Sequence, residues 1–136
     1  MKRLLAIDYG ERHIGIALSD TDQLIAYPYL TIDTRKTPQF FQRIAEITKQ
    51  QDIEKIIVGL PLNVDNLETK KSKQIKIFTK GLQNFVSLPI IFWDESFTTK
   101  KASEVLKIQK KSMKKNKSRL DMIAASLILK DFLQNR

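Results

Sequence analysis

One hundred and thirty-six residues, 42% of them hydrophobic and 29% charged, are typical of a single soluble globular domain covering 1–136, not of a disordered chain. The chain has no cysteine and one histidine, which excludes disulfides and argues against zinc, so any metal must be held by oxygen ligands, as Mg²⁺ and Mn²⁺ are. No apolar run approaches the roughly 20 residues that span a bilayer, and Asp8 interrupts the N-terminal apolar stretch too early for a signal peptide, which predicts a cytoplasmic protein.

The formal net charge of +9 is concentrated in one part of the chain. Between 107 and 119 there is no acidic residue, and the basic residues are Lys107, Lys110, Lys111, Lys114, Lys115, Lys117 and Arg119. A second, weaker cluster consists of Lys70, Lys71, Lys73, Lys76 and Lys80. Concentrated positive charge attracts polyanions by releasing their counterions, so this pattern predicts RNA or DNA as the partner. A solvated lysine-rich surface is the alternative interpretation.

The first third of the chain predicts three strands. Apolar runs cover 3–8 and 13–19, and the short break at Gly10 between them favours an antiparallel hairpin. A third run covers 24–32, where Pro28 favours an edge position because proline cannot donate a hydrogen bond to a neighbouring strand.

The period of the apolar pattern then changes. Helical spacing predicts a helix over 37–51, which starts at a Thr-Pro pair. Two runs, 55–60, which is apolar after Lys55, and 89–93, which is apolar throughout, predict buried strands of the parallel kind. Between them the apolar residues Ile75, Phe78, Leu82 and Phe85 recur at helical spacing and predict a second helix.

Two further helices complete the expected fold. One is capped by Thr98 or Thr99 and runs through 106, and the last covers 118–132 after an exposed, mobile basic segment at 110–117. Three strands followed by alternating helices and strands predict an α/β fold, with a mixed five-stranded sheet and helices on both of its faces.

Two carboxylates directly follow buried strands. Asp8 ends the first strand just before a glycine turn, and Glu95 follows the strand at 89–93. Burying a charge costs free energy unless the charge is paired or bound to metal, so packing alone does not explain Asp8. The ends of the first, fourth and fifth strands should open onto one edge of the sheet, where ligands of α/β proteins bind. We therefore expect Asp8 and Glu95 to be neighbours.

Asp121 supplies a third carboxylate, from the last helix. It lies on the apolar stripe that continues through Ala125 and Phe132, which predicts that it points inward, although it could instead only stabilise the helix dipole. Three carboxylates around a hard cation suit phosphodiester cleavage, because two magnesium ions about 4 Å apart can activate water and steady the leaving oxygen. The predicted catalytic and metal-binding residues are Asp8, Glu95 and Asp121.

Four segments, in the same order, resemble the motifs of the YqgF/RuvX family of RNase H-like nucleases. They are 8–20, which opens with DYGERHIGIA; 59–65, with GLPLNVD; 94–99, with DESFTT; and 120–129, with LDMIAASLIL. Any one of these motifs would be weak alone, but together they extend over nearly the whole chain.

The resemblance implies an RNase H-like fold and a nuclease that trims the 5′ end of precursor 16S ribosomal RNA. The family carboxylates match Asp8, Glu95 and Asp121, while Asp94 remains an alternative to Glu95. Three departures concern substrate positioning: Ser96 replaces the family arginine, His13 replaces a second basic residue, and 66–69 replaces a glycine-bearing stretch. The residues expected to bind nucleic acid are Arg12, Lys110, Lys111, Lys114, Lys115, Lys117 and Arg119.

Other interpretations of the sequence remain open. The hairpin that begins at Asp8 also resembles the phosphate loop of actin-like and sugar-kinase ATP-binding folds, which need two such domains. Loss of the arginine at Ser96 is compatible with a non-catalytic RNA-binding or ribosome-assembly module. Branched DNA is an alternative to RNA as the substrate. The chain is expected to be a monomer or a homodimer, because a junction resolvase needs two active sites.

Overall fold

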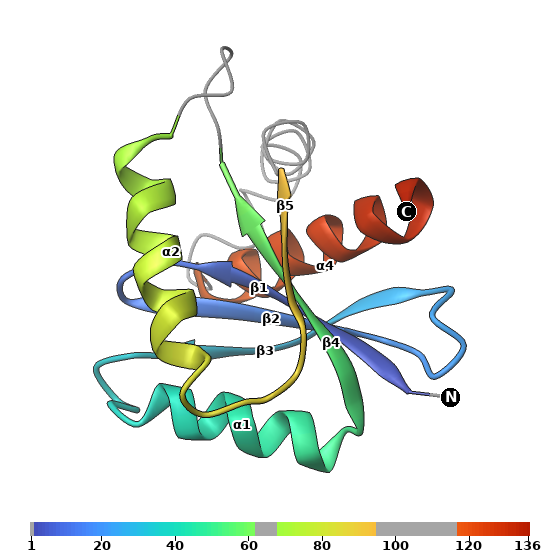
Figure 1. The fold of residues 1–136 in the computed structure, drawn as a ribbon, viewed down its shortest axis with the longest axis horizontal. Helices are drawn as coiled ribbons and strands as arrows, with labels where there is room; N and C mark the ends of the chain where they lie inside the picture. The colour runs from blue at the N-terminus through green and yellow to red at the C-terminus, as the bar shows by residue number, and fades with distance from the viewer. Residues whose placement is uncertain (1, 62–67, 95–116) are drawn as a thin grey trace.

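Five strands form one mixed sheet in the computed structural model of the chain (Figure 1). The structure describes residues 2–61, 68–94 and 117–136, and in the last of these segments it describes side chains from residue 120 onward. The strands are β1 (Arg3–Tyr9), β2 (His13–Ser19), β3 (Ala26–Asp33), β4 (Ile53–Leu60) and β5 (Ile90–Asp94). Their spatial order is β3-β2-β1-β4-β5, with β1, β2 and β3 antiparallel and with β4 parallel to both β1 and β5. The predicted hairpin, the edge position of β3 and the shared edge of the three strand ends are therefore confirmed.

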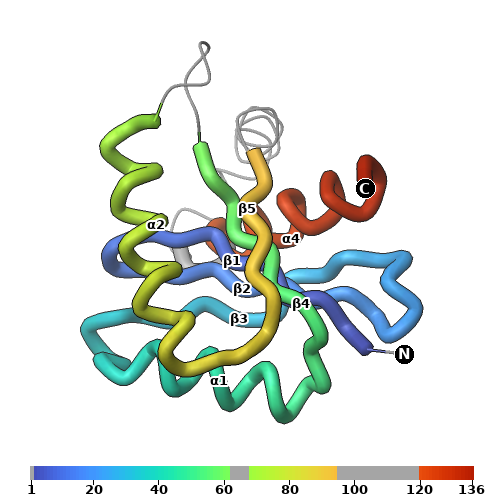
Figure 2. Tube along the Cα trace, viewed as in Figure 1, coloured from blue at the N-terminus to red at the C-terminus, as the bar shows by residue number. Residues whose placement is uncertain are grey.

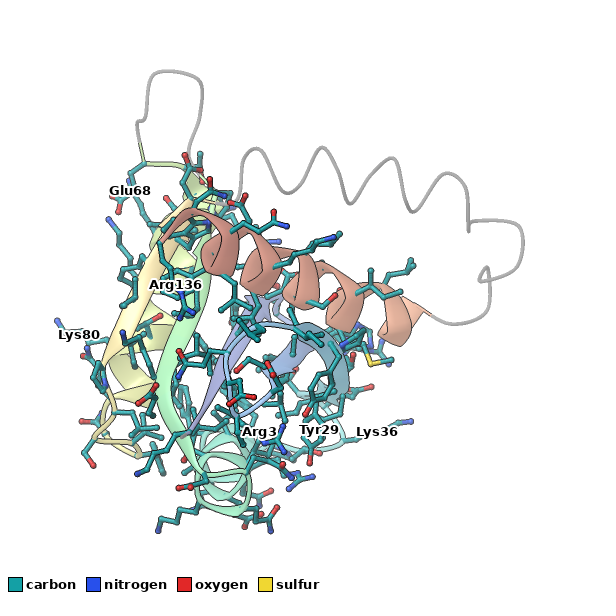
Figure 3. The ribbon with its side chains drawn as sticks, turned by 90° about the vertical axis from the view of Figure 1, so that its right-hand side faces the viewer. Arg3, Tyr29, Lys36, Glu68, Lys80 and Arg136 are labelled. Carbon is teal, nitrogen blue, oxygen red and sulfur yellow. The ribbon has the colours of Figure 1, made fainter. Side chains whose placement is uncertain are left out.

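Helices cover both faces of the sheet, as predicted. The helices are α1 (Phe40–Gln50), α2 (Lys70–Leu82) and α4 (Lys117–Asn135). The α1 and α2 helices lie on one face, and α4 crosses the other (Figures 2 and 3). No helix among the described residues is long and apolar enough to cross a membrane.

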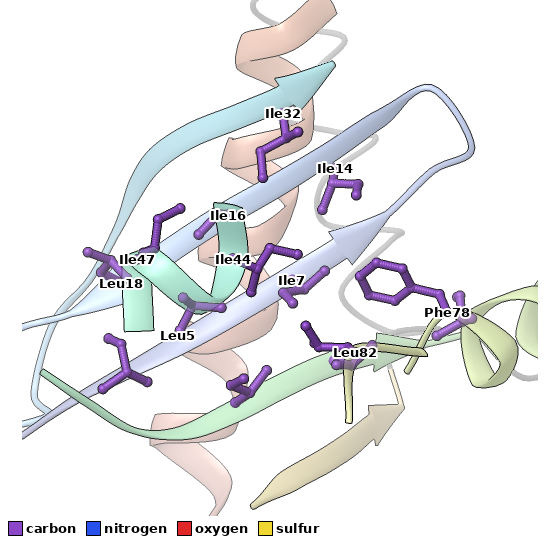
Figure 4. Close-up of a cluster of buried hydrophobic side chains, with 14 of the residues drawn as sticks. Leu5, Ile7, Ile14, Ile16, Leu18, Ile32, Ile44, Ile47, Phe78 and Leu82 are labelled. Atoms are coloured by element: carbon purple, nitrogen blue, oxygen red, sulfur yellow. The ribbon is translucent and has the colours of Figure 1, made fainter. Parts of the chain in front are cut away.

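The face covered by α1 and α2 is packed with large apolar side chains (Figure 4). Leu5 and Ile7 of β1 meet Ile44 of α1 and Phe78 of α2, and all four are at most 4% exposed. Burying a side chain of this size contributes roughly 1.5–3 kcal/mol. This layer is therefore the main source of the stability of the domain.

The α4 face is thinner. It combines small residues such as Ala6, Ala17 and Ala125 with Ile128 and Leu129. Small side chains on both elements let the helix backbone approach the strands closely. At the far side of this layer Trp93 packs edge-on against Phe132, with 5.2 Å between ring centroids, and its Nε1 donates to Asp131 Oδ2 at 2.7 Å.

Several boundaries differ from the sequence predictions because side chains satisfy the backbone locally. The Asp33 carboxylate accepts hydrogen bonds from the backbone N–H groups of Arg35 and Lys36, so a turn occupies the expected first residues of α1, which starts at Phe40 and not at 37. Likewise, Asp20 Oδ1 accepts from the backbone of Leu24 and Ile25, at 2.8 and 2.9 Å, and β3 begins only at Ala26.

The second helix also shifts relative to the prediction. It starts at Lys70 because Thr69 and Ser72 form a capping box, and it ends at Leu82, so Phe85 lies in the turn that follows. The last helix extends to Asn135, beyond the predicted end at 132. The predicted helix at 98–106 and most of the basic segment at 110–117 lie outside the described residues.

Candidate active site

Asp8 lies at the carboxyl edge of the sheet and on its α4 face. Successive side chains of a strand point to opposite faces, and Leu4 and Ala6 pack on the α4 side, whereas Leu5 and Ile7 pack on the other. Asp8 is an even number of residues from Leu4 and Ala6, so its side chain lies on the same α4 side of the sheet. It follows Ile7, the last residue of β1 to pair with β4, so Asp8 lies where that parallel pairing ends.

Gly15 brings the last helix onto this position. In the antiparallel ladder it is the direct partner of Asp8. A Cβ atom at Gly15 would lie 2.0 Å from the backbone oxygen of Asp121, far inside contact distance. No glycine among the described residues has a positive φ, so here glycine is required for space and not for backbone conformation. The start of α4 therefore rests directly beside Asp8, which brings the backbone of Asp121 close to it.

The two carboxylates share a partly buried environment. Burial raises the pKa of Asp8 from its usual 3.8 to about 6; Lys71 opposes the shift and the charge of Asp121 adds to it. Burial also raises the pKa of Asp121, while His13 and Lys71 lower it. Desolvation and like charge both disfavour the ionised forms, so a cation at this position would be strongly attracted.

The turn between β1 and β2 is fixed by contacts with Asp33, the last residue of β3, and with Thr34 after it. Arg12 Nε lies 3.8 Å and His13 Nε2 3.9 Å from Asp33 Oδ2. The Thr34 hydroxyl donates to the backbone oxygen of Glu11 at 2.6 Å, and its N–H donates to that of Arg12 at 2.8 Å. Arg12, which the sequence predicts to bind nucleic acid, therefore stands at an anchored turn with half of its side chain exposed.

The strand pleat distinguishes Asp94 from the other candidate carboxylates. Ile91 and Trp93 of β5 pack on the α4 side, whereas Ile90 packs on the α1 and α2 side. Asp94 has the parity of Ile90, so it lies on the face opposite to Asp8. The predicted alternative ligand Asp94 is therefore not a neighbour of Asp8, and Glu95 lies outside the described residues.

The described part of the site fits a hard cation. Two carboxylates, Asp8 and Asp121, face the same place, and no hydrogen-bond donor among the described residues satisfies either of them. Anionic oxygens of this kind are the ligands that Mg²⁺ and Mn²⁺ prefer. Residues 2–61, 68–94 and 120–136 contain no group of three side chains that could hold a metal, and the third predicted ligand is not among them.

Two site residues were not expected from the sequence. Gly15 was predicted only as part of a strand, although its place opposite Asp8 follows from the hairpin register. Lys71 belonged to a diffuse basic cluster, and its approach to the site depends on the capping box that starts α2 at the carboxyl edge of the sheet. The predicted nucleic-acid ligands Lys110, Lys111, Lys114 and Lys115 lie outside the described residues, as do the side chains of Lys117 and Arg119.

Comparison with known proteins agrees with this architecture. The family model described as "RuvX: Holliday junction resolvase" matches residues 2–135. A protein of Syntrophus aciditrophicus (strain SB) named "Putative pre-16S rRNA nuclease" is 36% identical over 131 residues, which are 96% of this chain and 87% of that protein.

Solved structures show the same fold at low sequence identity. The RuvC of T. thermophilus in complex with a Holliday junction substrate has a TM-score of 0.57 at 13% identity, over 94% of this chain and 92% of that one. The Fowlpox virus resolvase in complex with Holliday junction DNA has a TM-score of 0.59 at 15% identity, over 97% of each chain. The expected RNase H-like fold is therefore confirmed.

Proposed function

This chain belongs to the RuvX (Holliday junction resolvase) family, and from that premise we propose that it is a metal-dependent nuclease that matures the 5′ end of precursor 16S ribosomal RNA in the cytoplasm. The observation that carries the proposal is the apposition of Asp8 and Asp121 across Gly15. Burial raises the pKa of both carboxylates there, and no described donor satisfies them.

The proposed ligands of the metal are Asp8, Asp121 and Glu95. The pleat of β5 supports Glu95, because it assigns Asp94 to the opposite face. A bound Mg²⁺ or Mn²⁺ would supply an activated water and stabilise the leaving oxygen. Two of these carboxylates stand on regular elements, Asp8 at the end of β1 and Asp121 near the start of α4.

Lys71 and His13 set the charge of the site before substrate arrives. Both lower the pKa of Asp121, and Lys71 also lowers that of Asp8, so they favour the ionised carboxylates that a cation requires. Arg12, at the anchored turn, supplies a cation for the substrate backbone. We propose that the basic residues between 110 and 119 extend this contact along the nucleic acid.

Branched DNA is the second candidate substrate. It is supported by the structural likeness to two resolvases solved with Holliday junctions. A resolvase must cut paired strands, so this alternative requires a homodimer, whereas trimming one RNA strand does not. A third alternative, a non-catalytic binding module, rests on Ser96 in place of the family arginine.

A cleavage assay distinguishes the three. The protein is incubated with end-labelled precursor 16S rRNA leader or with a labelled four-way junction, with Mg²⁺, Mn²⁺ or EDTA. Asp8→Asn should lose cleavage by about 10³-fold or more while retaining binding. Asp22→Asn is the matched control, because Asp22 is an exposed aspartate in the β2–β3 turn, away from the site.

Each outcome assigns one function. Metal-dependent cleavage of the RNA that Asp8→Asn abolishes and Asp22→Asn preserves supports the proposal. Cleavage of the junction alone, by a dimer, assigns the resolvase. Binding without cleavage in the wild type, or equal cleavage by wild type and Asp8→Asn, refutes the metal-nuclease proposal.

A further inference from the structure

An aromatic-lined groove lies one residue away from Asp8, on the other face of the sheet. It has a volume of about 390 Å³ and is formed where the β1–β2 turn meets α1 and α2. Tyr9 of β1, Phe40 and Phe41 of α1, and Phe78 of α2 contribute its rings. A cavity of this size is in the range of roughly 300–1,000 Å³ that is usual for small-ligand pockets.

The rings form a connected set that is only partly covered. Centroid distances are 4.5 Å for Tyr9–Phe78, 5.4 Å for Phe41–Phe78 and 4.6 Å for Phe40–Phe41. Ile77, which completes one wall, is 72% exposed. Exposed apolar surface of this kind marks a binding site, and any nucleobase can stack on an aromatic ring because every base has a π-face.

Two polar side chains at the rim of the groove, Glu11 and Gln74, could form hydrogen bonds with the edge of a nucleobase. Gln74 Nε2 donates to Glu11 Oε1 at 3.0 Å, and both side chains line the groove. The second carboxylate oxygen of Glu11 can accept from ring and amino N–H groups, while the Gln74 amide can donate to a carbonyl. Guanine presents two neighbouring N–H donors and a carbonyl on its Watson–Crick edge, which unpaired bases expose.

The charge around the groove suits a polyanion. Lys73 and Lys80 lie one helical turn before and after Ile77, and Lys70 lies one turn before Gln74. None of these three lysines forms an ion pair with another residue of the described segments. Lys80 extends outward from the end of α2 (Figure 3). The single acidic residue of the groove, Glu11, is the one placed to contact a base.

We propose that this groove binds one unpaired base of the nucleic-acid strand that is cut, with a preference for guanine through Glu11 and Gln74. The inference rests on the proposed nuclease function for the strand that it addresses. Asp8 and Tyr9 are consecutive in β1 and face opposite sides of the sheet. A strand that crosses this edge has its scissile phosphate at Asp8 and a neighbouring base at Tyr9, so the substrate must be single-stranded next to the cut.

Binding without cleavage tests the proposal. Labelled uridine heptamers with a central guanosine or a central uridine are titrated with the Asp8→Asn protein in EDTA, and fluorescence anisotropy gives the affinity. The guanosine heptamer should bind about tenfold more tightly, and pairing it with its complement should remove that advantage. Equal affinities for the two heptamers, or an advantage that persists in the duplex, overturn the proposal.

Two exposed substitutions locate the effect. Glu11→Gln should abolish the guanosine advantage, whereas Glu46→Gln, at an exposed glutamate of α1 outside the groove, should preserve it. Ile77→Ser should weaken binding of the guanosine heptamer severalfold, and Ile25→Ser, at a 63% exposed isoleucine of the β2–β3 turn, should not. If Glu11→Gln and Glu46→Gln change the guanosine advantage equally, or if Ile77→Ser and Ile25→Ser weaken binding equally, the groove does not bind the base.

The outcome is separable from that of the cleavage assay. Guanosine-dependent binding by a protein that cuts no RNA leaves the groove standing and removes the nuclease. Cleavage of RNA by a protein that shows no guanosine-dependent binding supports the nuclease function and refutes the proposed base-binding groove. If sedimentation shows that Ile77→Ser dissociates a dimer while oligonucleotide affinity is unchanged, the groove is a contact between two copies and the proposal is wrong.

Discussion

The two faces of the sheet are packed in opposite ways. Toward α1 and α2, residues such as Ile7 and Ile16 bury large side chains against other large side chains. Toward α4, the same strands present Ala6, Gly15 and Ala17, and the helix backbone lies almost on the strand. The first face is a conventional core. The second gives up apolar volume so that a helix can bring Asp121 beside Asp8.

Within a single strand, residues that face α1 and α2 should therefore mainly determine stability, and residues that face α4 should mainly determine function. Neighbouring residues of β2, Gly15 and Ile16, point to opposite faces, so substitutions one position apart should act on different properties. The α4 face also carries two carboxylates whose ionisation burial opposes, which is a cost that the other face does not have.

Ile16→Ala should cause the greatest loss of stability. Ile16 is fully buried on the α1 and α2 side, and truncating such a side chain typically costs about 2–5 kcal/mol. The free energy of unfolding from urea denaturation should fall accordingly, while cleavage per folded molecule stays near the wild-type rate. A specific rate that falls together with stability would contradict the separation of the two faces.

Gly15→Ala should lose both stability and activity. The added Cβ would meet a backbone oxygen at 2.0 Å, which cannot rotate away, so α4 must shift at a cost of about 3 kcal/mol and carry Asp121 with it. Gly81→Ala is the matched control on the other face, since its Cβ would meet the flexible ring of Phe41 at 2.6 Å. Because alanine also favours the helix by about 1 kcal/mol and a side chain can shift where a backbone cannot, that variant should lose clearly less stability than Gly15→Ala. Equal losses in the two variants would contradict the account.

Asp8→Asn should stabilise the metal-free protein in a pH-dependent way. Burial raises the pKa of Asp8 from 3.8 to about 6, so the folded protein retains a proton that the unfolded chain releases between these values. Below about pH 4 Asp8 is protonated in both states and does not lower the free energy of unfolding. Between pH 4 and 6 its ionisation in the unfolded chain destabilises the folded protein increasingly, and above pH 6 the destabilisation is complete. Urea denaturation in EDTA should show a gain of about 3 kcal/mol for Asp8→Asn at pH 8 and little at pH 4. A gain that does not vary with pH would be inconsistent with desolvation of Asp8.

Lys71→Met should have the smallest effect, a shift of less than about one pH unit in the acid limb of the cleavage profile. The ammonium of Lys71 lowers the pKa of both carboxylates, so its loss should move the acid limb to higher pH. Lys49→Met, at an exposed lysine of α1, is the control, because Lys49 does not act on Asp8 or Asp121. Identical pH profiles of cleavage for the two variants would show that Lys71 does not influence the ionisation of Asp8 and Asp121.

The sheet and its helices could be predicted because their signals are local. The apolar period assigned β1, β2 and β4 correctly within two residues, and Asp8 stood out as a charge at the end of an apolar run. The start of α1 was placed too early because the Asp33 turn competes with the helix, which a helical period does not reveal. The turn at Asp20 delayed β3 in the same way.

The details of the site depend on contacts between distant parts of the chain. Gly15 and Asp121 are brought together only by the crossing of α4 over β2, and the groove requires three elements to meet. The pleat of β5 is a further example. Ile90, Ile91, Phe92 and Trp93 are all apolar, so the sequence did not indicate which face Asp94 takes, and only the packing of Ile91 and Trp93 against the α4 side shows it.

The central claim is that Asp8 and Asp121 hold one cation together. Isothermal titration of Mn²⁺ into the wild type, Asp8→Asn, Asp121→Asn and the double variant tests it most directly. Each single substitution should abolish most of the binding, and the double variant should bind hardly less than either, because the two residues act as a unit. Unchanged Mn²⁺ affinity in either single variant, or losses that simply add in the double variant, would contradict it.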